Sequence, residues 1–94
     1  MLLVDKMEIR LKLYGSSRLL SNKKIFIIKI PKNTNIEKLR KILSKIIFQK
    51  YLENDLKNLS KTAAFFSEKD ELINDKYKLK NKELISIIPP ISGG

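Results

Sequence analysis

The sequence predicts an α+β domain in which a mixed four- to five-stranded sheet packs against one main amphipathic helix. Three observations indicate this fold class. Apolar and polar residues alternate strictly from Met7 to Tyr14, which is the period-two pattern of a half-buried strand. After Pro31, apolar residues recur at three- and four-residue spacing, as on one face of a helix. A short apolar run from Leu84 to Ile88 then predicts a final strand.

The first two strands are expected to pair as an antiparallel hairpin. Gly15-Ser16-Ser17 marks a turn after the first strand, and the connecting loop is expected around residues 18–22. The second strand runs from Ile25 to Ile30, and Pro31 ends it. Because Lys29 belongs on the solvent side, the alternation predicts which side chains face the core. These are Ile9, Leu11, Leu13, Phe26, Ile28 and Ile30, with Leu19 and Leu20 tucked against the core and Ile25 and Ile27 facing outward.

One helix is expected from Ile36 to about Gln49. Thr34 or Asn35 is the expected N-cap, and Thr34 with Glu37 three residues later matches the pattern of a capping box. The apolar stripe should pack against the sheet, while a row of lysines covers the solvent side. The stripe consists of Ile36, Leu39, Ile42, Leu43, Ile46 and Ile47, and the lysines are Lys38, Lys41 and Lys45.

The region between this helix and the final strand has weaker patterns. Residues 51–61 form either a short second helix or an ordered loop, and a helix would turn Leu52, Leu56 and Leu59 inward. Residues 62–67 predict a third strand that places Phe65 and Phe66 on opposite faces. Leu72-Ile73 is a candidate for a short additional strand.

The final strand leads into a tail that cannot continue the sheet. Its alternation places Ile85 and Ile87 in the core and leaves Leu84, Ser86 and Ile88 on the open face. Pro89 and Pro90 follow and offer no backbone N–H, so the strand ladder ends there. Ile91, Ser92, Gly93 and Gly94 complete the sequence, and the two glycines, which lack a β-carbon, suit a narrow channel in another protein.

The composition excludes several classes of function. The chain has 94 residues, enough for one domain with a single modest core. It contains no cysteine and no histidine, which excludes disulfides, thiolate nucleophiles, Cys/His zinc sites and imidazole acid–base catalysis. It also lacks a phosphate-binding glycine loop. We therefore expect no bound cofactor, no metal and no catalytic residues beyond the chain terminus.

The chain shows no sign of a membrane or export signal. No run approaches the ~18 consecutive apolar residues of a membrane span. Asp5 interrupts the apolar start at Met1–Val4, too early for a signal peptide. A cytoplasmic protein without a membrane partner is expected.

The net charge is +10, from 20 lysines and arginines against 10 acidic residues. A basic domain of this kind could neutralise the phosphates of nucleic acid. A solvated lysine surface is favoured instead, because the cations are nearly all lysine and are spread along the whole chain. The arginines, which alone provide a forked donor, are Arg10, Arg18 and Arg40.

The ending Ile87-Ile88-Pro89-Pro90-Ile91-Ser92-Gly93-Gly94 resembles the C-terminus of the MoaD/ThiS family of sulfur carriers, above all the small subunits of molybdopterin synthase. The resemblance extends from about Met7 to Gly94 and includes Tyr14-Gly15-Ser16-Ser17-Arg18. It implies a β-grasp, ubiquitin-like fold at residues 7–88, after an N-terminal extension at residues 1–6 and before a tail at residues 89–94. Lys82 is a departure, since relatives carry glycine in the turn before the last strand, and the high positive charge is another.

The resemblance also implies a function for the tail. A terminal carboxylate with a pKa of roughly 3.3–3.7 is ionised and a poor electrophile at neutral pH. In the family, an E1-like enzyme uses ATP to adenylate the terminal glycine, here Gly94, and a sulfur donor converts it to a thiocarboxylate. The large synthase subunit is the second expected partner. The residues expected to contact partners are Leu84, Ile88, Pro89, Pro90, Ile91, Ser92 and Gly93.

Two alternatives stay open. A related carrier could serve tRNA thiolation, or it could be joined to lysines as a ubiquitin-like modifier, because each role needs the same diglycine. A basic β-grasp module that binds RNA without covalent chemistry is a third hypothesis, which leaves the ending without a role.

Overall fold

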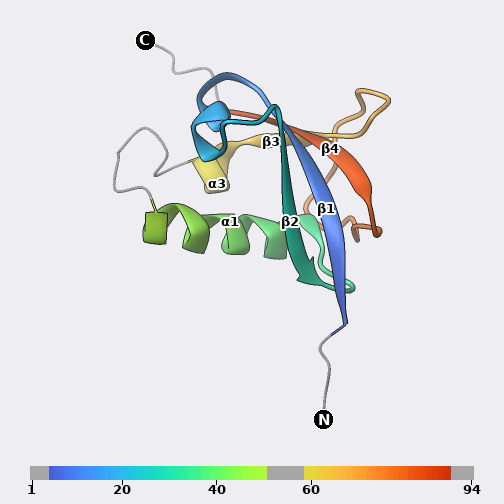
Figure 1. Cartoon of the computed structure of the whole chain (residues 1–94). Coiled ribbons are helices and arrows are strands. Elements are labelled where there is room, and N and C mark those ends of the chain that lie inside the picture. Colours follow the sequence, from blue (N-terminus) through green and yellow to red (C-terminus); the bar gives the residue numbers. More distant parts are fainter. Residues whose placement is uncertain (1–4, 51–58, 90–94) are drawn as a thin grey trace.

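The computed structural model describes residues 5–50 and 59–89 of the chain (Figure 1). In this part the strands and the main helix follow one another in the order β-β-α-β-β, with two short helical segments between them. They are β1 (Lys6–Leu13), the 3₁₀ helix η1 (Gly15–Leu20), β2 (Ile25–Pro31), α1 (Ile36–Lys50), α3 (Leu59–Thr62), β3 (Ala64–Phe66) and β4 (Glu83–Ile88).

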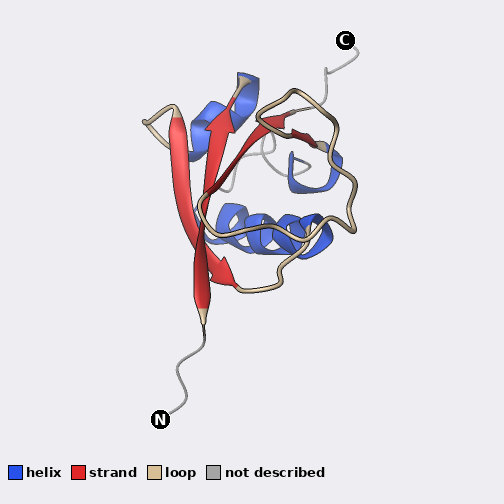
Figure 2. Ribbon diagram, turned by 90° about the vertical axis from the view of Figure 1, so that its right-hand side faces the viewer, coloured by secondary structure: helices blue, strands red, loops and turns tan. Residues whose placement is uncertain are grey.

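Four strands form one mixed sheet in the order β2-β1-β4-β3. The β1–β2 pair is antiparallel, as the predicted hairpin requires, and β3 pairs with β4 in the same sense. The two central strands, β1 and β4, run parallel, with Leu11 opposite Ile85. The connection between them contains α1, which crosses one face of the sheet in Figures 1 and 2. The mixed sheet with one main helix confirms the predicted β-grasp fold.

The core lies between this face of the sheet and α1. Alternation along the strands turns every second side chain toward the helix, and those side chains are almost fully buried. The predicted inward residues Ile9, Leu11, Ile30, Ile85 and Ile87 have no measurable exposure. The helix contributes Ile36, Leu39, Leu43 and Ile47, while Lys38, Lys41 and Lys45 are exposed, as predicted.

The start of α1 selects one of the two predicted caps. The Lys38 backbone N–H donates to Asn35 Oδ1 at 2.8 Å, so Asn35 is the N-cap. The Thr34 hydroxyl instead donates to the Pro31 carbonyl at 2.6 Å. The predicted capping box between Thr34 and Glu37 is therefore wrong, because the Thr34 side chain stabilises the preceding turn.

The segment around β3 differs from the sequence prediction. The third strand is shorter than residues 62–67, since Leu59–Thr62 forms the short helix α3. Leu72 makes an isolated bridge to Phe66 and Leu72-Ile73 is not a strand, so the described sheet has four strands. Phe65 is fully buried and Phe66 half-buried, on opposite faces as predicted. Leu59 is buried as well, whereas Leu52 and Leu56 lie outside the described residues.

The connection between β1 and β2 is more ordered than a simple turn. Residues 15–20 form η1, and Leu20 is buried, as predicted. Leu19 also belongs to this segment, although its side chain is outside the described set. This helical turn lies beside the end of β4, which makes it part of the surroundings of the tail.

Candidate functional site

The predicted tail begins where the central strand β4 ends. Ile88 is the last residue of β4, and the half-buried Pro89 follows it. The predicted site residues Pro90, Ile91, Ser92, Gly93 and Gly94 lie outside the described residues. The structure therefore defines the base of the tail and the surface around it.

Gly15 lies directly against the base of the tail. A β-carbon added at this glycine would be 3.1 Å from Cγ of Pro89. The Gly15 backbone also has a φ of +56°, a left-handed conformation that disfavours side chains. Glycine at this position thus leaves room for the proline ring beside the first turn of η1.

Ser17 joins η1 to the strands on either side. Its hydroxyl is fully buried, donates to the Tyr14 carbonyl at 2.6 Å and accepts from the Tyr14 N–H at 2.8 Å. The same oxygen lies 3.5 Å from the Ile87 carbonyl oxygen, one residue before the end of β4. Sequence reasoning treated Gly15 and Ser17 only as turn residues, because their contact with the tail depends on the parallel pairing of β1 with β4.

The sheet face opposite α1, which we term the open face, is mostly apolar near the tail. Two predicted docking residues, Leu84 and Ile88, lie there half-buried, in register with Arg10 and Ala64 of the neighbouring strands. On β2, Ile25 and Ile27 are 39% and 54% exposed on the same face, as predicted. Phe66 extends the apolar surface on the other side of β4, in register with Ser86.

Two cations lie within this apolar surface. Arg10 is between Ile27 and Leu84 in the strand register, and its Nε is 3.2 Å from the Glu8 carboxylate. Lys12 is the next outward residue of β1, and its ammonium lies 5.6 Å from the centre of the Tyr14 ring. A hydrogen bond to Tyr14 raises the pKa of Lys12. A complementary partner surface would be apolar with acidic groups.

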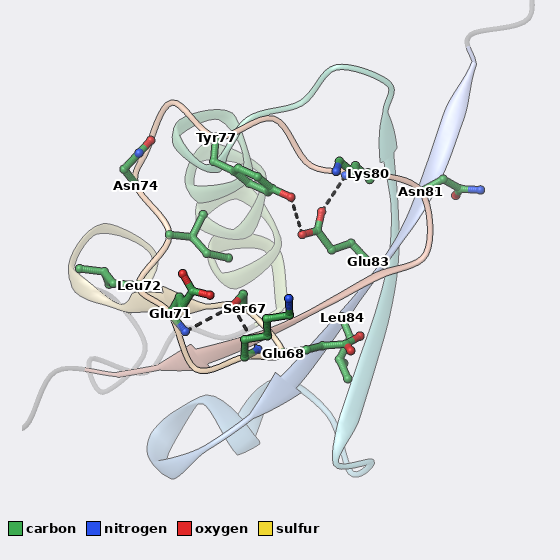
Figure 3. Close-up of a pocket in the computed structure, with 12 residues that line it drawn as sticks. Ser67, Glu68, Glu71, Leu72, Asn74, Tyr77, Lys80, Asn81, Glu83 and Leu84 are labelled. Carbon is green, nitrogen blue, oxygen red and sulfur yellow. Dashed lines mark hydrogen bonds between the residues drawn. The ribbon is translucent and has the colours of Figure 1, made fainter.

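A hollow of about 650 Å³ lies beside the start of β4 (Figure 3). The loop between β3 and β4 forms most of its wall, and Leu84 connects it to the open face. Figure 3 shows Tyr77 and Glu83 pointing toward each other, with the Tyr77 hydroxyl donating to Glu83 Oε2 at 2.7 Å. Glu83 Oε1 accepts from the Lys80 N–H at 2.8 Å. The Glu83 carboxylate, which raises the pKa of Tyr77, is thus engaged in holding this loop.

Within residues 5–50 and 59–89, no cluster of acidic side chains could hold a metal ion. In the same part of the chain, no helix has both the length and the apolar character needed to cross a membrane. The candidate site consists of the base of the tail, the residues of η1 beside it and the open face.

Comparison with known proteins finds its matches among solved structures. No protein-family model matches the sequence, and the search of curated proteins finds no match either. The chain is 27% identical to a chain from the complex of subunits 1 and 2 of the Helicobacter pylori molybdopterin-converting factor, with a TM-score of 0.57 and coverage of 94% of this chain and 100% of the other.

Two archaeal proteins have the same fold. Small archaeal modifier protein 1 of Haloferax volcanii is 9% identical with a TM-score of 0.62, and the match covers 90% of this chain and 99% of that protein. The ubiquitin of Caldiarchaeum subterraneum is 14% identical with a TM-score of 0.58, over 96% and 100%. These two likenesses show the ubiquitin-like fold. The chain therefore has a ubiquitin-like fold, and at 27% identity its sequence is similar to that of the Helicobacter pylori chain over nearly its whole length.

Proposed function

We propose that this chain is a sulfur carrier for molybdopterin synthesis and acts in the cytoplasm as the small subunit of a molybdopterin synthase. The observation that carries the proposal is the likeness to the Helicobacter pylori complex over nearly the whole chain, at 27% identity. The Pro-Pro-Ile-Ser-Gly-Gly ending that follows β4 supports it, because this ending resembles the tail of the family.

Gly94 carries the proposed chemistry. Its carboxylate attacks the α-phosphorus of ATP, pyrophosphate leaves, and an acyl-adenylate forms. Hydrosulfide, HS⁻, from a donor then attacks the acyl carbon, the C–O bond to AMP breaks, and after loss of the S–H proton the terminus is a thiocarboxylate. The chain has no cysteine and no nucleotide-binding loop, so an E1-like enzyme provides the ATP site and a separate donor provides the sulfur.

The base of the tail and the open face have separate roles in this proposal. Gly93 and Gly94 enter the partner's channel, and Ser92 and Ile91 follow at its mouth. Pro89 and Pro90 direct the tail away from the sheet, while Leu84 and Ile88 contribute to the surface on which the E1-like enzyme and the large subunit dock. The half-buried positions of Leu84 and Ile88 on the open face support this role.

Intact-mass spectrometry tests the chemistry. The untreated protein should have the mass of a chain that ends at Gly94. After incubation with the cognate E1-like enzyme, ATP and sulfide, the mass should rise by the difference between sulfur and oxygen. A variant lacking Gly93 and Gly94 is the matched control and should gain nothing. An unchanged mass for the full chain would contradict the proposal.

Docking is tested separately from the chemistry. Ile88→Asp should weaken co-elution with the large synthase subunit, because it places a charge within the apolar open face. Lys45→Asp changes an exposed residue on the opposite side of the molecule and should leave co-elution intact. If Ile88→Asp and Lys45→Asp changed co-elution equally, the open face would not be the docking surface.

The second candidate keeps the activation of Gly94 and changes the acceptor to tRNA or to lysines of other proteins. The likeness to small archaeal modifier protein 1 and to a ubiquitin favours this candidate. Purification of the tagged chain from its own cells distinguishes the two. A carrier for molybdopterin synthesis should co-elute with a synthase subunit in a fixed ratio, whereas a modifier should give a ladder of larger conjugates. If the chain serves tRNA thiolation, its deletion from the cells should lower the amount of thiolated nucleosides.

A further inference from the structure

One buried hydroxyl lies where three segments meet at the base of the tail. The Ser17 side chain has no measurable exposure. Its Oγ donates to the Tyr14 carbonyl at 2.6 Å, accepts from the Tyr14 N–H at 2.8 Å and lies 3.5 Å from the Ile87 carbonyl oxygen. Tyr14 follows the end of β1, and Ile87 precedes Pro89 by two residues. This oxygen therefore joins the end of β1, η1 and the end of β4.

The turn at Tyr14 depends on this hydroxyl. A serine hydroxyl has one proton to donate and accepts through its lone pairs, so the Ser17 side chain can bond both backbone groups of Tyr14. The Ser17 N–H also donates to the Tyr14 carbonyl, at 3.1 Å. Because buried polar groups are almost always paired, alanine at position 17 would leave the Tyr14 N–H without its acceptor. It would also remove the contact between η1 and Ile87.

The same turn sets the position of the Pro89 ring. Gly15 lies between Tyr14 and Ser17, and a β-carbon added at Gly15 would be 3.1 Å from Cγ of Pro89. The ring of a proline fixes its own φ near about −65°. The direction in which the chain leaves β4 therefore depends on where the backbone of η1 supports this ring.

Tyr14 also belongs to the open face. Its backbone is extended, with φ −130° and ψ 150°, so it continues the alternation of β1 beyond the buried Leu13. Leu13 is opposite Ile87 in the register, which places Tyr14 beside Ile88. The Tyr14 side chain is exposed there, next to the proposed docking residue. The docking surface and the base of the tail thus share one buried hydroxyl.

From this geometry we propose that Ser17 is a positioning residue for the activation of Gly94. It ties the Pro89 ring to Tyr14, so that an E1-like enzyme docked on the open face meets the tail in a fixed direction. This inference rests on the proposed function, because it concerns how Gly94 is presented to that enzyme. Ser17 acts through Tyr14 and Gly15 rather than on Gly94 itself.

Steady-state loading of Gly94 separates presentation from docking. The carrier concentration is varied against the cognate E1-like enzyme with ATP and sulfide. Ser17→Ala should lower kcat about tenfold, because a displaced reacting group loses its alignment. KM should change less than about twofold, since the apolar side chains of the open face remain in place. Tyr14→Ala keeps the backbone bonds to Ser17 and should show the opposite split, a higher KM with kcat nearly unchanged.

Two variants control for the loss of a hydroxyl elsewhere in the fold. Ser60→Ala removes a buried hydroxyl that has no hydrogen-bond partner among the described residues. Tyr77→Phe removes a bonded hydroxyl near the start of β4, at the opposite end of the strand from the tail. Both variants should retain kcat and KM, with circular dichroism to verify that each is folded. A fall of kcat in Tyr77→Phe as large as in Ser17→Ala would assign the effect to general stability and overturn the proposal.

The direction of the tail can also be measured without the loading reaction. The chain has no cysteine, so Ser92→Cys accepts a single nitroxide label whose paramagnetic broadening of amide signals reports its position. The amides of η1 and of β3, which pairs with β4 on its other side, should be broadened unequally. Adding Ser17→Ala should make the two sets more nearly equal. An identical broadening pattern in the two proteins would overturn the proposal.

The proposed function and this inference fail in different ways. Absence of a mass gain in the unaltered chain would contradict the function, and the label would still test the direction of the tail. Loading by Ser17→Ala with an unchanged kcat would contradict the role of Ser17 alone, whether or not KM rises. If Ser17→Ala does not fold, hydrogen exchange in the unaltered chain decides the question. Docking of the E1-like enzyme should slow exchange of the Tyr14 amide, and unchanged exchange there would overturn the proposal.

Discussion

At Gly15 the backbone conformation and the neighbouring proline impose separate demands on the residue. Gly15→Ala should lower the free energy of unfolding by about 1–2 kcal/mol, because alanine is strained at a φ of +56° and its β-carbon would meet Pro89 Cγ at 3.1 Å. Urea denaturation measures this change. The same variant should slow loading of Gly94, since the displaced Pro89 redirects the tail.

A double-mutant cycle separates the two demands. In a Pro89→Ala background the proline ring is absent, so Gly15→Ala should cost less by about 0.5–1 kcal/mol while the backbone strain persists. Strictly additive effects would mean that Gly15 does not position Pro89. The room that Gly15 leaves for the Pro89 ring would then make no contribution to stability.

Lys82 holds a backbone conformation better suited to glycine. Its φ is 65°, and its N–H donates to the Glu8 carbonyl at 2.6 Å, so the turn before β4 keeps the left-handed conformation despite the lysine. Lys82→Gly should raise the free energy of unfolding by about 0.5–1 kcal/mol, because relief of strain exceeds the added freedom of the unfolded chain. Lys80→Gly, at a residue without positive φ, should be destabilising. A loss of stability in Lys82→Gly, measured by urea denaturation, would contradict this account.

At the scale of elements, Arg40 joins α1 to the structures on its far side. Its Nη1 donates to the Ala63 carbonyl at 2.6 Å, beyond the end of α3, and its Nε donates to Asp75 Oδ1 at 3.1 Å. The guanidinium also lies 4.9 Å from the centre of the Phe65 ring. One side chain thus connects α1, α3, β3 and the loop before β4.

Replacing this residue tests how much the connection contributes. Arg40→Ala should lower the free energy of unfolding by about 2 kcal/mol, because charge-assisted hydrogen bonds to partly buried carbonyls are lost. Arg40→Lys should recover only part of that loss, since lysine lacks the forked donor. Asp75→Ala should cost less than about 1 kcal/mol, because the Asp75 side chain is 53% exposed. Equal losses for Arg40→Ala and Asp75→Ala in thermal or urea unfolding would assign the effect to the ion pair alone.

Local patterns were sufficient to predict the main helix and three of the strands. Strict alternation located β1, and short apolar runs located β2 and β4, whose phase assigned the faces of Ile85 and Leu84 correctly. The segment from Ser67 to Ile73 showed no such pattern. Its conformation depends on bonds from the Ser67 N–H to the Glu71 carbonyl and from the Ile73 N–H to the Phe65 carbonyl, which no repeat predicts.

In the candidate site, the positions of two residues were predictable in the same way. The position of Leu84 and Ile88 on the open face was predicted from the alternation along one strand. The contacts of Gly15 and Ser17 with the end of β4 could not be predicted in this way, because they depend on the tertiary pairing of β1 with β4. Contacts between segments far apart in sequence thus decided the roles of Gly15 and Ser17. The N-cap failed for a different reason, because Thr34 matched one local motif but its hydroxyl donates to the Pro31 carbonyl, a competing local hydrogen bond.

At the scale of the whole molecule, basic residues outnumber acidic ones. The chain carries 20 basic and 10 acidic residues, and the described part contains three ion pairs, two of which involve arginine. Arg40 is engaged within the fold and Arg10 is paired with Glu8, so two of the three arginines have partners inside the molecule. Most lysines are exposed, and their mutual repulsion opposes the compact state.

This repulsion predicts a response to salt. Added NaCl should raise the Tm, because the Debye length falls from ~30 Å at 0.01 M to ~10 Å at 0.1 M ionic strength and screens the exposed lysines. Lys41→Glu, on the solvent side of α1, should raise the Tm at low salt and reduce the slope of Tm against salt concentration. Lys41→Gln removes one charge without reversing it and should give an intermediate slope. A Tm that falls as NaCl increases would show that attraction within ion pairs outweighs the repulsion between lysines, and it would contradict this account.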